Sequence, residues 1–209
     1  MLKRDYDGPG KLFENGSGFY YYTGKMFDML AVSFLWLLGS LPVITVGASF
    51  SALYAAASRS IRQEEGSVGE RFWKSYKRDL KSAILPWVLF AGAICLLLLN
   101  IGILWNLSDG LFRLFFVLFY GFCILLLIAA LGYVFPAVSR FDMPAGWILK
   151  LSFYLTVRHL PVSLFLIVLT LAGYFLVLAV PVLVLVIPGV WAWLISMLVD
   201  PVLDQHLPQ

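Results

Sequence analysis

Few residues in this chain have the type and spacing that catalysis or metal binding needs. The segment from Gly18 to Lys25 resembles a phosphate-binding loop, but five residues separate its glycines and Met26 stands where Ser or Thr is needed. Cys95 and Cys123 lie in long apolar runs, where a thiol usually behaves as a small apolar side chain. The two histidines are far apart in the sequence. We therefore predict no catalytic residue, no cofactor and no metal site.

The polar residues that remain also favour structural roles. Four carboxylates in one stretch are interspersed with Lys and Arg, which is typical of a solvated loop: Glu64, Glu65, Glu70 and Asp79. The later apolar runs hold no ionisable group between their ends, and Asn100, followed by Thr170, is their strongest polar candidate. Hydrogen bonding between helices is the expected role of both. Because ion-coupled transporters usually carry intramembrane charges, such a transporter is disfavoured.

The composition indicates where the chain resides. Of its 209 residues, 61% are apolar and 13% are charged, and the mean hydropathy is +0.90. Soluble domains hold about 25% charged residues. These values exclude a soluble enzyme and predict an all-α, polytopic helix bundle that forms one integral-membrane domain over residues 1–209. The net charge of +3 fits cationic loops that face anionic lipid headgroups, and no nucleic-acid-binding signature is present.

Uncharged runs locate the membrane spans, since a helix needs about 20 apolar residues to cross. They predict spans at about 83–106, 111–137, 161–179 and 182–199, the last two joined by a turn near Val180-Pro181, with Pro188-Gly189 as the competing break. The N-terminal part has two solutions. One is a single crossing near 26–46 followed by a surface helix, and the other is a hairpin of spans at about 20–41 and 43–59.

Loop charge separates these two solutions, because Lys and Arg stay preferentially in the cytoplasm. Five spans leave 10 of the 15 Lys and Arg residues inside, whereas six spans leave 14 inside and only Arg113 outside. We therefore prefer six spans with both termini cytoplasmic, with five as the alternative. The segment 43–59 is rich in Ala and Ser, so as a span it must be buried among other helices.

Each of the two long cytoplasmic loops, at about 60–82 and 138–160, contains a predicted amphipathic helix. In the first, apolar residues recur at a spacing of four beside a basic face; they are Phe72, Tyr76, Leu80 and Ile84, next to Arg71, Lys74, Lys77, Arg78 and Lys81. In the second, a stripe follows Pro144; it consists of Trp147, Leu151, Tyr154, Leu155 and Arg158. These patterns predict interfacial helices that serve as elbows into the next span or as docking surfaces.

One group of segments resembles a known family. These segments are Leu41–Ala48, Ala52–Tyr54, Arg62–Gly66, Phe72–Lys81 followed by Trp87, and the later segment Arg158–Pro161. Together they resemble the YesL-like family of bacterial membrane proteins, a domain of unknown function. Asp79 departs from the pattern, because the family usually carries Asn there. The candidate contact residues on these segments are Leu41, Pro42, Thr45, Gly47, Tyr54, Phe72, Tyr76, Lys77, Arg78, Trp87, Arg158, His159 and Pro161.

The stretch 41–48 also has a physical interpretation. Pro42 and Gly47 bracket β-branched residues, which is typical of a turn or unwound segment between helices. Thr45 could satisfy backbone groups that such a turn leaves free. The motif is therefore either a hairpin corner or a contact surface for a partner or ligand.

The resemblance implies a multi-pass protein of the bacterial cytoplasmic membrane, with genes commonly beside carbohydrate ABC importers and with no established enzymatic activity. We therefore expect a non-catalytic accessory subunit that packs against the permease subunits of a carbohydrate (oligosaccharide) ABC importer and supports its assembly or activity. The alternative is a stand-alone transporter or channel for a neutral solute such as a sugar, which Trp105, Tyr120 and Tyr174 could stack against. A membrane sensor and an integral-membrane enzyme rank below both.

Overall fold

A computed structural model describes residues 17–62, 66–107, 110–141 and 143–204, and the elements within them are all helical, which confirms the all-α prediction. The α-helices are α1 (Ser17–Gly39), α2 (Val46–Ala56), α3 (Val68–Leu107), α4 (Leu111–Arg140), α5 (Ala145–Arg158), α6 (Leu160–Ala179) and α7 (Ile187–Asp204). Three shorter helical pieces connect them: η2 (Val43–Thr45), the π-helical turn η3 (Ala57–Arg62) and η4 (Pro181–Leu185).

Three of these helices are long and apolar enough to cross a bilayer, namely α3, α4 and α6, and α7 holds a shorter apolar stretch, Ile187–Leu203. The chain is therefore a membrane protein by its helices. The preferred count of six spans is not tested by this finding. The N-terminal calls on residues 1–16 lie outside the described part of the chain.

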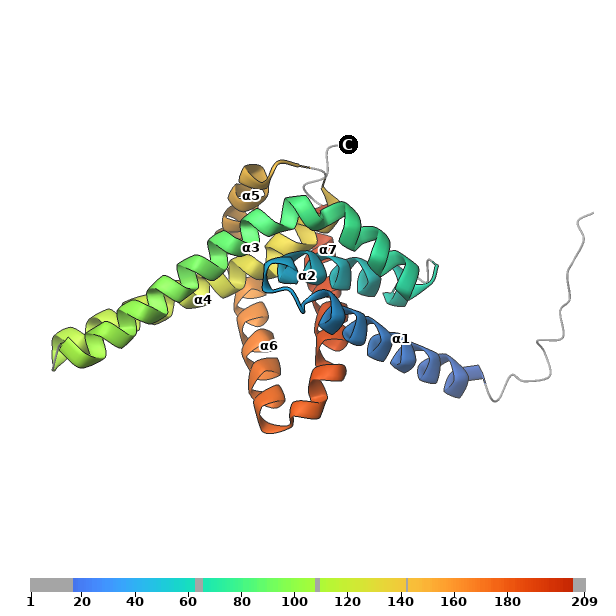
Figure 1. Cartoon of the computed structure of the whole chain (residues 1–209), viewed down its shortest axis with the longest axis horizontal. Coiled ribbons are helices and arrows are strands. Elements are labelled where there is room, and N and C mark those ends of the chain that lie inside the picture. Colours follow the sequence, from blue (N-terminus) through green and yellow to red (C-terminus); the bar gives the residue numbers. More distant parts are fainter. Residues whose placement is uncertain (1–16, 63–65, 108–109, 142, 205–209) are drawn as a thin grey trace, which may run out of the picture.

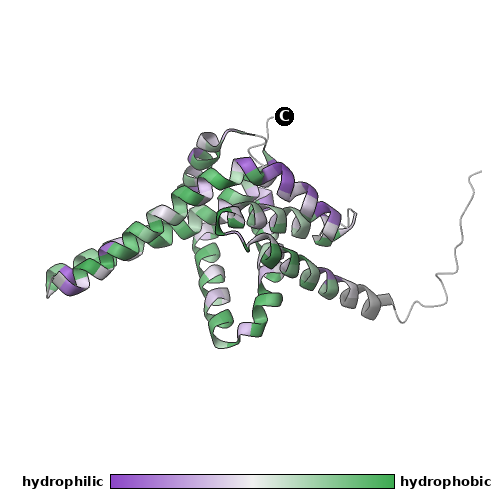
Figure 2. Cartoon of the chain, viewed as in Figure 1, coloured by the Kyte–Doolittle hydropathy of each residue, from purple (hydrophilic) through white to green (hydrophobic). Residues whose placement is uncertain are grey.

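The helices diverge from a common body, as Figure 1 shows. The body contains α2, α5 and the first half of α3. Three arms leave it: α1, the hairpin of α3 and α4, and the hairpin of α6 and α7. Hydrophilic residues gather on the first half of α3, whereas the two hairpin arms are mostly hydrophobic (Figure 2). We call the outer part of the α3–α4 hairpin, residues 88–107 and 111–128, the long arm.

Helix α2 occupies the centre of the body. Nine of its residues are buried, which small Ala, Ser and Gly side chains permit by close packing. The prediction that segment 43–59 is buried among other helices is confirmed for most of residues 47–58, whereas Val43 and Ile44 at its start are exposed. It runs along the first half of α3, where a Cβ on Gly47 would lie 2.8 Å from the Ala83 carbonyl oxygen and where Ser51 bonds to Asp79.

Helix α3 differs from the prediction. An amphipathic loop helix and a separate span were expected, but residues 68–107 form one helix of 40 residues with Pro86 inside it. At about 1.5 Å per residue it is about 60 Å long. The predicted elbow is therefore absent. The predicted apolar stripe is correct in Phe72, which is fully buried, while Lys74 and Lys81 are exposed on the other side.

The long arm is exposed along most of its length. Its tip is closed by a cation–π contact in which the Arg113 guanidinium lies 5.0 Å from the centroid of the Trp105 ring. The prediction that Asn100 bonds to another helix is wrong. Its side-chain amide is exposed and donates to the Leu96 carbonyl oxygen of the same helix, at 2.8 Å.

The predicted turn between the last two spans is confirmed. Helix α6 ends at Ala179, and Pro181 opens η4. The competing Pro188-Gly189 pair lies inside α7, where Gly189 packs on α1 and its amide donates to Ser33 Oγ at 2.9 Å. Thr170 bonds between helices as predicted, since it accepts from Trp191 Nε1 at 3.2 Å.

Helix α5 begins after Pro144, as the sequence indicates, but buries a different face. Ile148 and Leu155 are fully buried, whereas Trp147 and Tyr154 point outward and are 64% and 48% exposed. These two aromatic residues of the predicted stripe therefore face away from the protein, and the interfacial position of this helix stays a prediction. Each ring carries a cation, with Lys150 over Trp147 and Arg158 over Tyr154, both 5.5 Å from the ring centroid.

Candidate functional site

The turn between α1 and α2 is held against α3 by hydrogen bonds from two α3 side chains that belong to the candidate contact residues. Trp87 Nε1 donates to the Val43 carbonyl oxygen at 2.8 Å, and the Tyr76 hydroxyl donates to the Gly39 carbonyl oxygen at 3.3 Å. Gly47 lies against the same helix, where a Cβ would be 2.6 Å from the Trp87 Cβ. Two segments that are separate in the sequence therefore pack together. We call residues 39–47 with Tyr76 and Trp87 of α3 the docked corner.

Thr45 closes this corner from within. Its hydroxyl lies 2.9 Å from the Gly39 carbonyl oxygen and 2.8 Å from that of Pro42, so it can donate to either. The expected role of Thr45 in satisfying backbone groups is confirmed. Leu41 and Val43 point outward and are 77% and 72% exposed, so the corner also presents an apolar surface.

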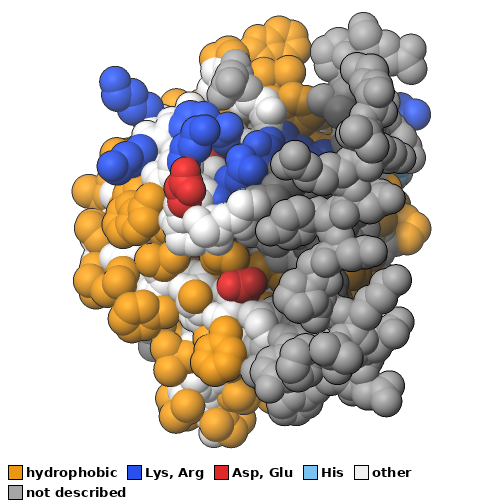
Figure 3. Space-filling model, turned by 90° about the vertical axis from the view of Figure 1, so that its right-hand side faces the viewer, with side chains coloured by type: hydrophobic (Ala, Val, Ile, Leu, Met, Phe, Trp, Pro, Cys, Tyr) orange, Lys and Arg blue, Asp and Glu red, His pale blue; other side chains and the backbone are white. Residues whose placement is uncertain are grey.

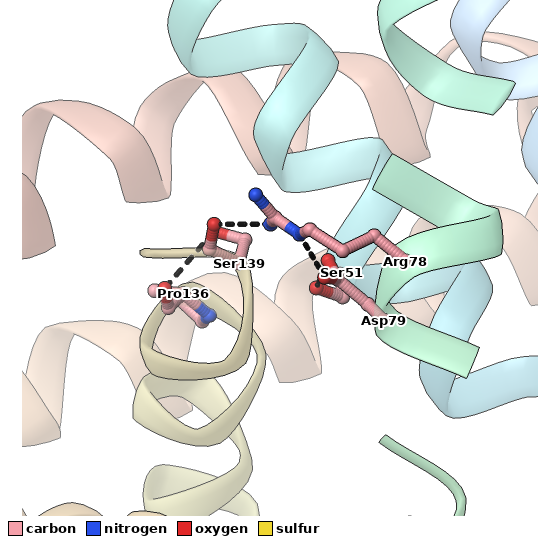
Figure 4. A network of polar contacts seen from close by, with 5 residues as sticks. All are labelled: Ser51, Arg78, Asp79, Pro136 and Ser139. Atoms are coloured by element: carbon pink, nitrogen blue, oxygen red, sulfur yellow. Dashed lines mark hydrogen bonds and ion pairs between the residues drawn. The ribbon is translucent and has the colours of Figure 1, made fainter. Parts of the chain in front are cut away.

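Asp79 is buried, contrary to the prediction of a solvated loop carboxylate, because α2 covers it. Its side chain is 3% exposed and accepts from Ser51 Oγ at 2.7 Å and from Arg78 Nε at 2.6 Å. The Arg78 guanidinium also donates to the Ser139 carbonyl oxygen at 2.6 Å. Figure 4 shows how Arg78 reaches from α3 to the end of α4.

A second buried carboxylate, Asp200, lies near the end of α7. It is 2% exposed and forms an ion pair with Arg140, whose Nη2 is 2.9 Å from Asp200 Oδ1. Tyr54 donates its hydroxyl to Oδ1, and Ser58 Oγ donates to Oδ2 at 2.9 Å. Removing one partner of a buried ion pair typically costs about 3–5 kcal/mol of stability. Asp200 therefore joins α2, η3, α4 and α7 strongly.

The two carboxylates belong to one system. Ser51, Tyr54 and Ser58 are three and four residues apart, so they share one side of α2 and η3. Ser139 and Arg140 are neighbours at the end of α4. We call the whole set the junction network: Ser51, Tyr54, Ser58, Arg78, Asp79, Ser139, Arg140 and Asp200. It fixes the place where the helices of the body meet the arms.

A cavity of about 630 Å³ lies where the arms leave the body. Trp36, Phe50 and Trp191 line it, with Phe50 stacked on Phe135 at 5.2 Å between ring centroids. Tyr174, which was expected to stack on a sugar, is among the lining residues, whereas Trp105 and Tyr120 are not. The structure therefore does not bring the three predicted stacking residues together.

Comparison with known proteins adds one finding. Residues 29–101 match a family described as "Protein of unknown function, DUF624". Over this part, about a third of the chain, the protein is similar to that family. No curated protein and no solved structure matches the chain. This match agrees with the resemblance to a family of unknown function that the sequence indicated, while the YesL-like name rests on the resemblance alone.

The DUF624 match covers the docked corner and Asp79, but not Arg140 or Asp200. The match runs from within α1 to the long arm. Within it lie the motif residues Tyr54 and Phe72, both buried, and Lys77, which is exposed. The later motif residues Arg158, His159 and Pro161 form the corner between α5 and α6, outside the match. There the His159 carbonyl oxygen accepts from the Ser163 amide at 3.0 Å.

The outer side of α3, within the residues that match the family, is basic. Lys and Arg gather on the upper part of one face of the molecule, with hydrophobic side chains below them (Figure 3). Lys74, Lys77 and Lys81 are exposed on this side of α3, and Trp73 beside them is 43% exposed. Basic groups next to an exposed indole suit the headgroup layer of a membrane.

Sequence reasoning missed Arg140, Asp200 and the serines of the junction network. One signal was available, because Arg140 and Asp200 each stand at the end of an apolar run, and the predicted spans place both ends on the cytoplasmic side. Opposite charges in such positions can pair. Among the described residues, no group of three His, Cys, Asp or Glu side chains could hold a metal ion.

Proposed function

We propose that five segments of this chain cross the bilayer: α1, the long-arm parts of α3 and α4, α6, and α7. The support is the position of α2, which packs along a part of α3 whose other side exposes Lys74, Lys77 and Lys81. Lysine at the centre of a bilayer costs about 2.5–3.5 kcal/mol or more. This packing favours the five-span alternative over a second crossing at 43–59. It leaves the C-terminus with the basic body in the cytoplasm and the N-terminus outside.

The function that we propose is that of a non-catalytic accessory subunit in the bacterial cytoplasmic membrane, which supports the assembly or activity of a carbohydrate ABC importer. The observation that carries this proposal is the long arm. Its apolar side chains are exposed on both helices and lie apart from the body (Figure 1). On α4 they are Leu114, Phe115, Leu118, Phe119 and Phe122, each more than 50% exposed.

The construction of the arm supports this role. Helix α3 runs without interruption from the basic side of the body to the tip of the arm, so the arm is a direct continuation of the body. Helices in a membrane associate through packing and hydrogen bonds. Because the long arm projects from the rest of the protein, a partner can pack against both of its helices. The type of partner, an ABC permease, comes from the family resemblance.

Photo-crosslinking in native membranes tests this proposal. A photoreactive amino acid at Leu118, on the long arm, should yield an adduct with a permease subunit that mass spectrometry identifies. The matched control is the same amino acid at Leu164, which is also 64% exposed but lies on α6. Equal protein adducts at both positions, or none at Leu118, would contradict an arm that binds a permease.

The alternative of a sugar transporter has less support. The cavity is lined almost entirely by apolar side chains, and burying sugar hydroxyls without hydrogen-bond partners costs about 1–3 kcal/mol each. Uptake of a sugar by proteoliposomes that contain this chain alone would nevertheless establish the alternative.

A further inference from the structure

The cavity has two chemically different ends. On α3, the lining residues run from Trp87 near the body to Ile94, and on α6 they run from Thr170 near the body to Val177. On α4, which runs in the opposite direction, Ile128 is far from the body and Phe135 is near it. Seven residues of helix span about 10 Å. The cavity is therefore a slot about 10 Å deep. It is aromatic near the body and mostly aliphatic farther out, where Tyr174 is also in the lining.

The aromatic end contains a donor that has no acceptor. Trp36 lines this end, and its Nε1 is buried without a hydrogen-bond partner among the described residues. The other indole donor there, Trp191 Nε1, is satisfied by Thr170. Leaving a buried N–H unpaired is unfavourable, and buried indole N–H groups usually find a partner. An occupant with an acceptor at this end would supply it.

The surroundings determine what can enter. The cavity lies between α3, α4 and α6, which are the three helices that qualify as membrane spans, so hydrocarbon chains are the surrounding solvent. Gly132 and Gly173 in its wall let helices pack closely, since a Cβ would lie 3.0 Å from Leu166 Cδ1 and 3.3 Å from Ile187 Cγ2, respectively. Its volume falls within the range of about 300–1,000 Å³ that small-molecule pockets have.

We propose that this cavity binds one acyl chain of a membrane glycerolipid, with the ester carbonyl of that chain accepting a hydrogen bond from Trp36 Nε1. The aliphatic end takes the methylene chain, and the headgroup lies toward the basic body. This site is independent of the proposed accessory function, since it requires no partner protein.

The test uses the full chain in vesicles that contain phosphatidylglycerol with a diazirine in the middle of one acyl chain. After irradiation, adducts are mapped to peptides. We expect adducts at Leu131, which lines the cavity, in addition to those on the exposed long arm. Val177→Trp, which fills the aliphatic end, should lower the Leu131 adduct at least fivefold and leave the arm adducts unchanged.

Two comparisons keep this result interpretable. Leu176→Trp is the matched control, because Leu176 neighbours Val177 on α6 but does not line the cavity and is 51% exposed. Ile94→Trp fills the same end from α3 and should repeat the effect if Val177→Trp does not fold. Undiminished Leu131 adducts in the folded cavity-filling variant would overturn the proposal. Lipid adducts on the exposed arm but none at Leu131 of the wild-type chain would also overturn it.

Competition by unlabelled lipids tests the hydrogen bond separately. A diester phosphatidylglycerol should compete for the Leu131 adduct about fivefold better than the diether lipid with the same chains, which lacks the carbonyl. Trp36→Phe keeps an aromatic ring but removes the donor, so this preference should vanish. An ester preference that persists in Trp36→Phe, or that is absent from the wild type, would contradict the assigned role of Trp36.

Discussion

At the scale of single residues, the buried charges distinguish this chain from a simple bundle of apolar helices. Asp200 and Asp79 are both at most 3% exposed, and each is met by an arginine and by a hydroxyl from α2 or η3. The sequence predicted neither. Asp79 stands between basic residues, and this pattern is the same whether the carboxylate is solvated or paired. Asp200 ends an apolar run, and its partner Arg140 is far away in the sequence. Only the packing of α2 against α3 and α7 buries them.

Asp200→Ala should destabilise the protein by about 3–5 kcal/mol, because it leaves the Arg140 guanidinium, 17% exposed, without its carboxylate. Thermal unfolding in mild detergent measures this loss. The double variant Asp200→Leu, Arg140→Met should recover much of it, since apolar replacement of a buried pair is often close to neutral. Glu70→Gln, at an exposed position, is the control and should change stability by less than about 0.5 kcal/mol. A double variant that is less stable than Asp200→Ala would disagree with this account.

Asp79→Asn should be tolerated, with a loss of no more than about 1 kcal/mol. The amide oxygen still accepts from Ser51, and the lost ion pair involves Arg78, which is 41% exposed and hence weakly coupled. Asp79→Ala should cost about 1–3 kcal/mol, because the buried Ser51 hydroxyl then loses its acceptor. Equal unfolding midpoints for the two variants would show that the hydrogen bond from Ser51 contributes nothing.

At the scale of elements, apolar runs predicted most helices correctly. The runs at 111–137 and 161–179 are α4 and α6, and the turn at Val180-Pro181 follows from a proline that cannot continue a helix without losing a hydrogen bond. The continuity of α3 could not be predicted, because a helix can change from amphipathic to apolar without a break in its backbone. The docked corner was anticipated only as a turn, since its contacts with Trp87 and Tyr76 are long-range.

The docked corner makes one glycine essential. Gly47→Ala should destabilise the protein by about 1–3 kcal/mol, because the new Cβ would lie 2.6 Å from the Trp87 Cβ and 2.8 Å from a backbone oxygen. Gly92→Ala on α3 is the matched control, since a Cβ there meets nothing within 4 Å. It should be neutral or stabilising by up to about 1 kcal/mol, as alanine favours helix. Similar unfolding midpoints for both variants would refute close packing at this corner.

At the scale of the whole molecule, a basic body carries three apolar arms. The body is fixed by the junction network and the docked corner, whereas the long arm is exposed over most of its surface. Composition alone predicted a membrane protein. It could not predict that α2 would lie beside the charged half of α3, because span counting treats each apolar run separately.

The five-span topology predicts that the start of α1 faces the outside and the start of α3 faces the cytoplasm. In a background with Cys95→Ala and Cys123→Ala, a membrane-impermeant maleimide applied to intact cells should label Ser17→Cys. Ser67→Cys, next to the start of α3, should react only after the membrane is permeabilised. Protection of Ser17→Cys in intact cells would instead support six spans with a cytoplasmic N-terminus.

The most direct test of the accessory function is the composition of the complex that this chain forms at its native expression level. A tagged chain is purified from its own membrane in mild detergent, and the co-purifying proteins are quantified by mass spectrometry. We predict ABC permease subunits in a fixed ratio to this chain, and their loss when Leu118 and Phe122 on the long arm are both changed to Ala. Recovery of the chain alone in every gentle detergent would contradict the accessory function.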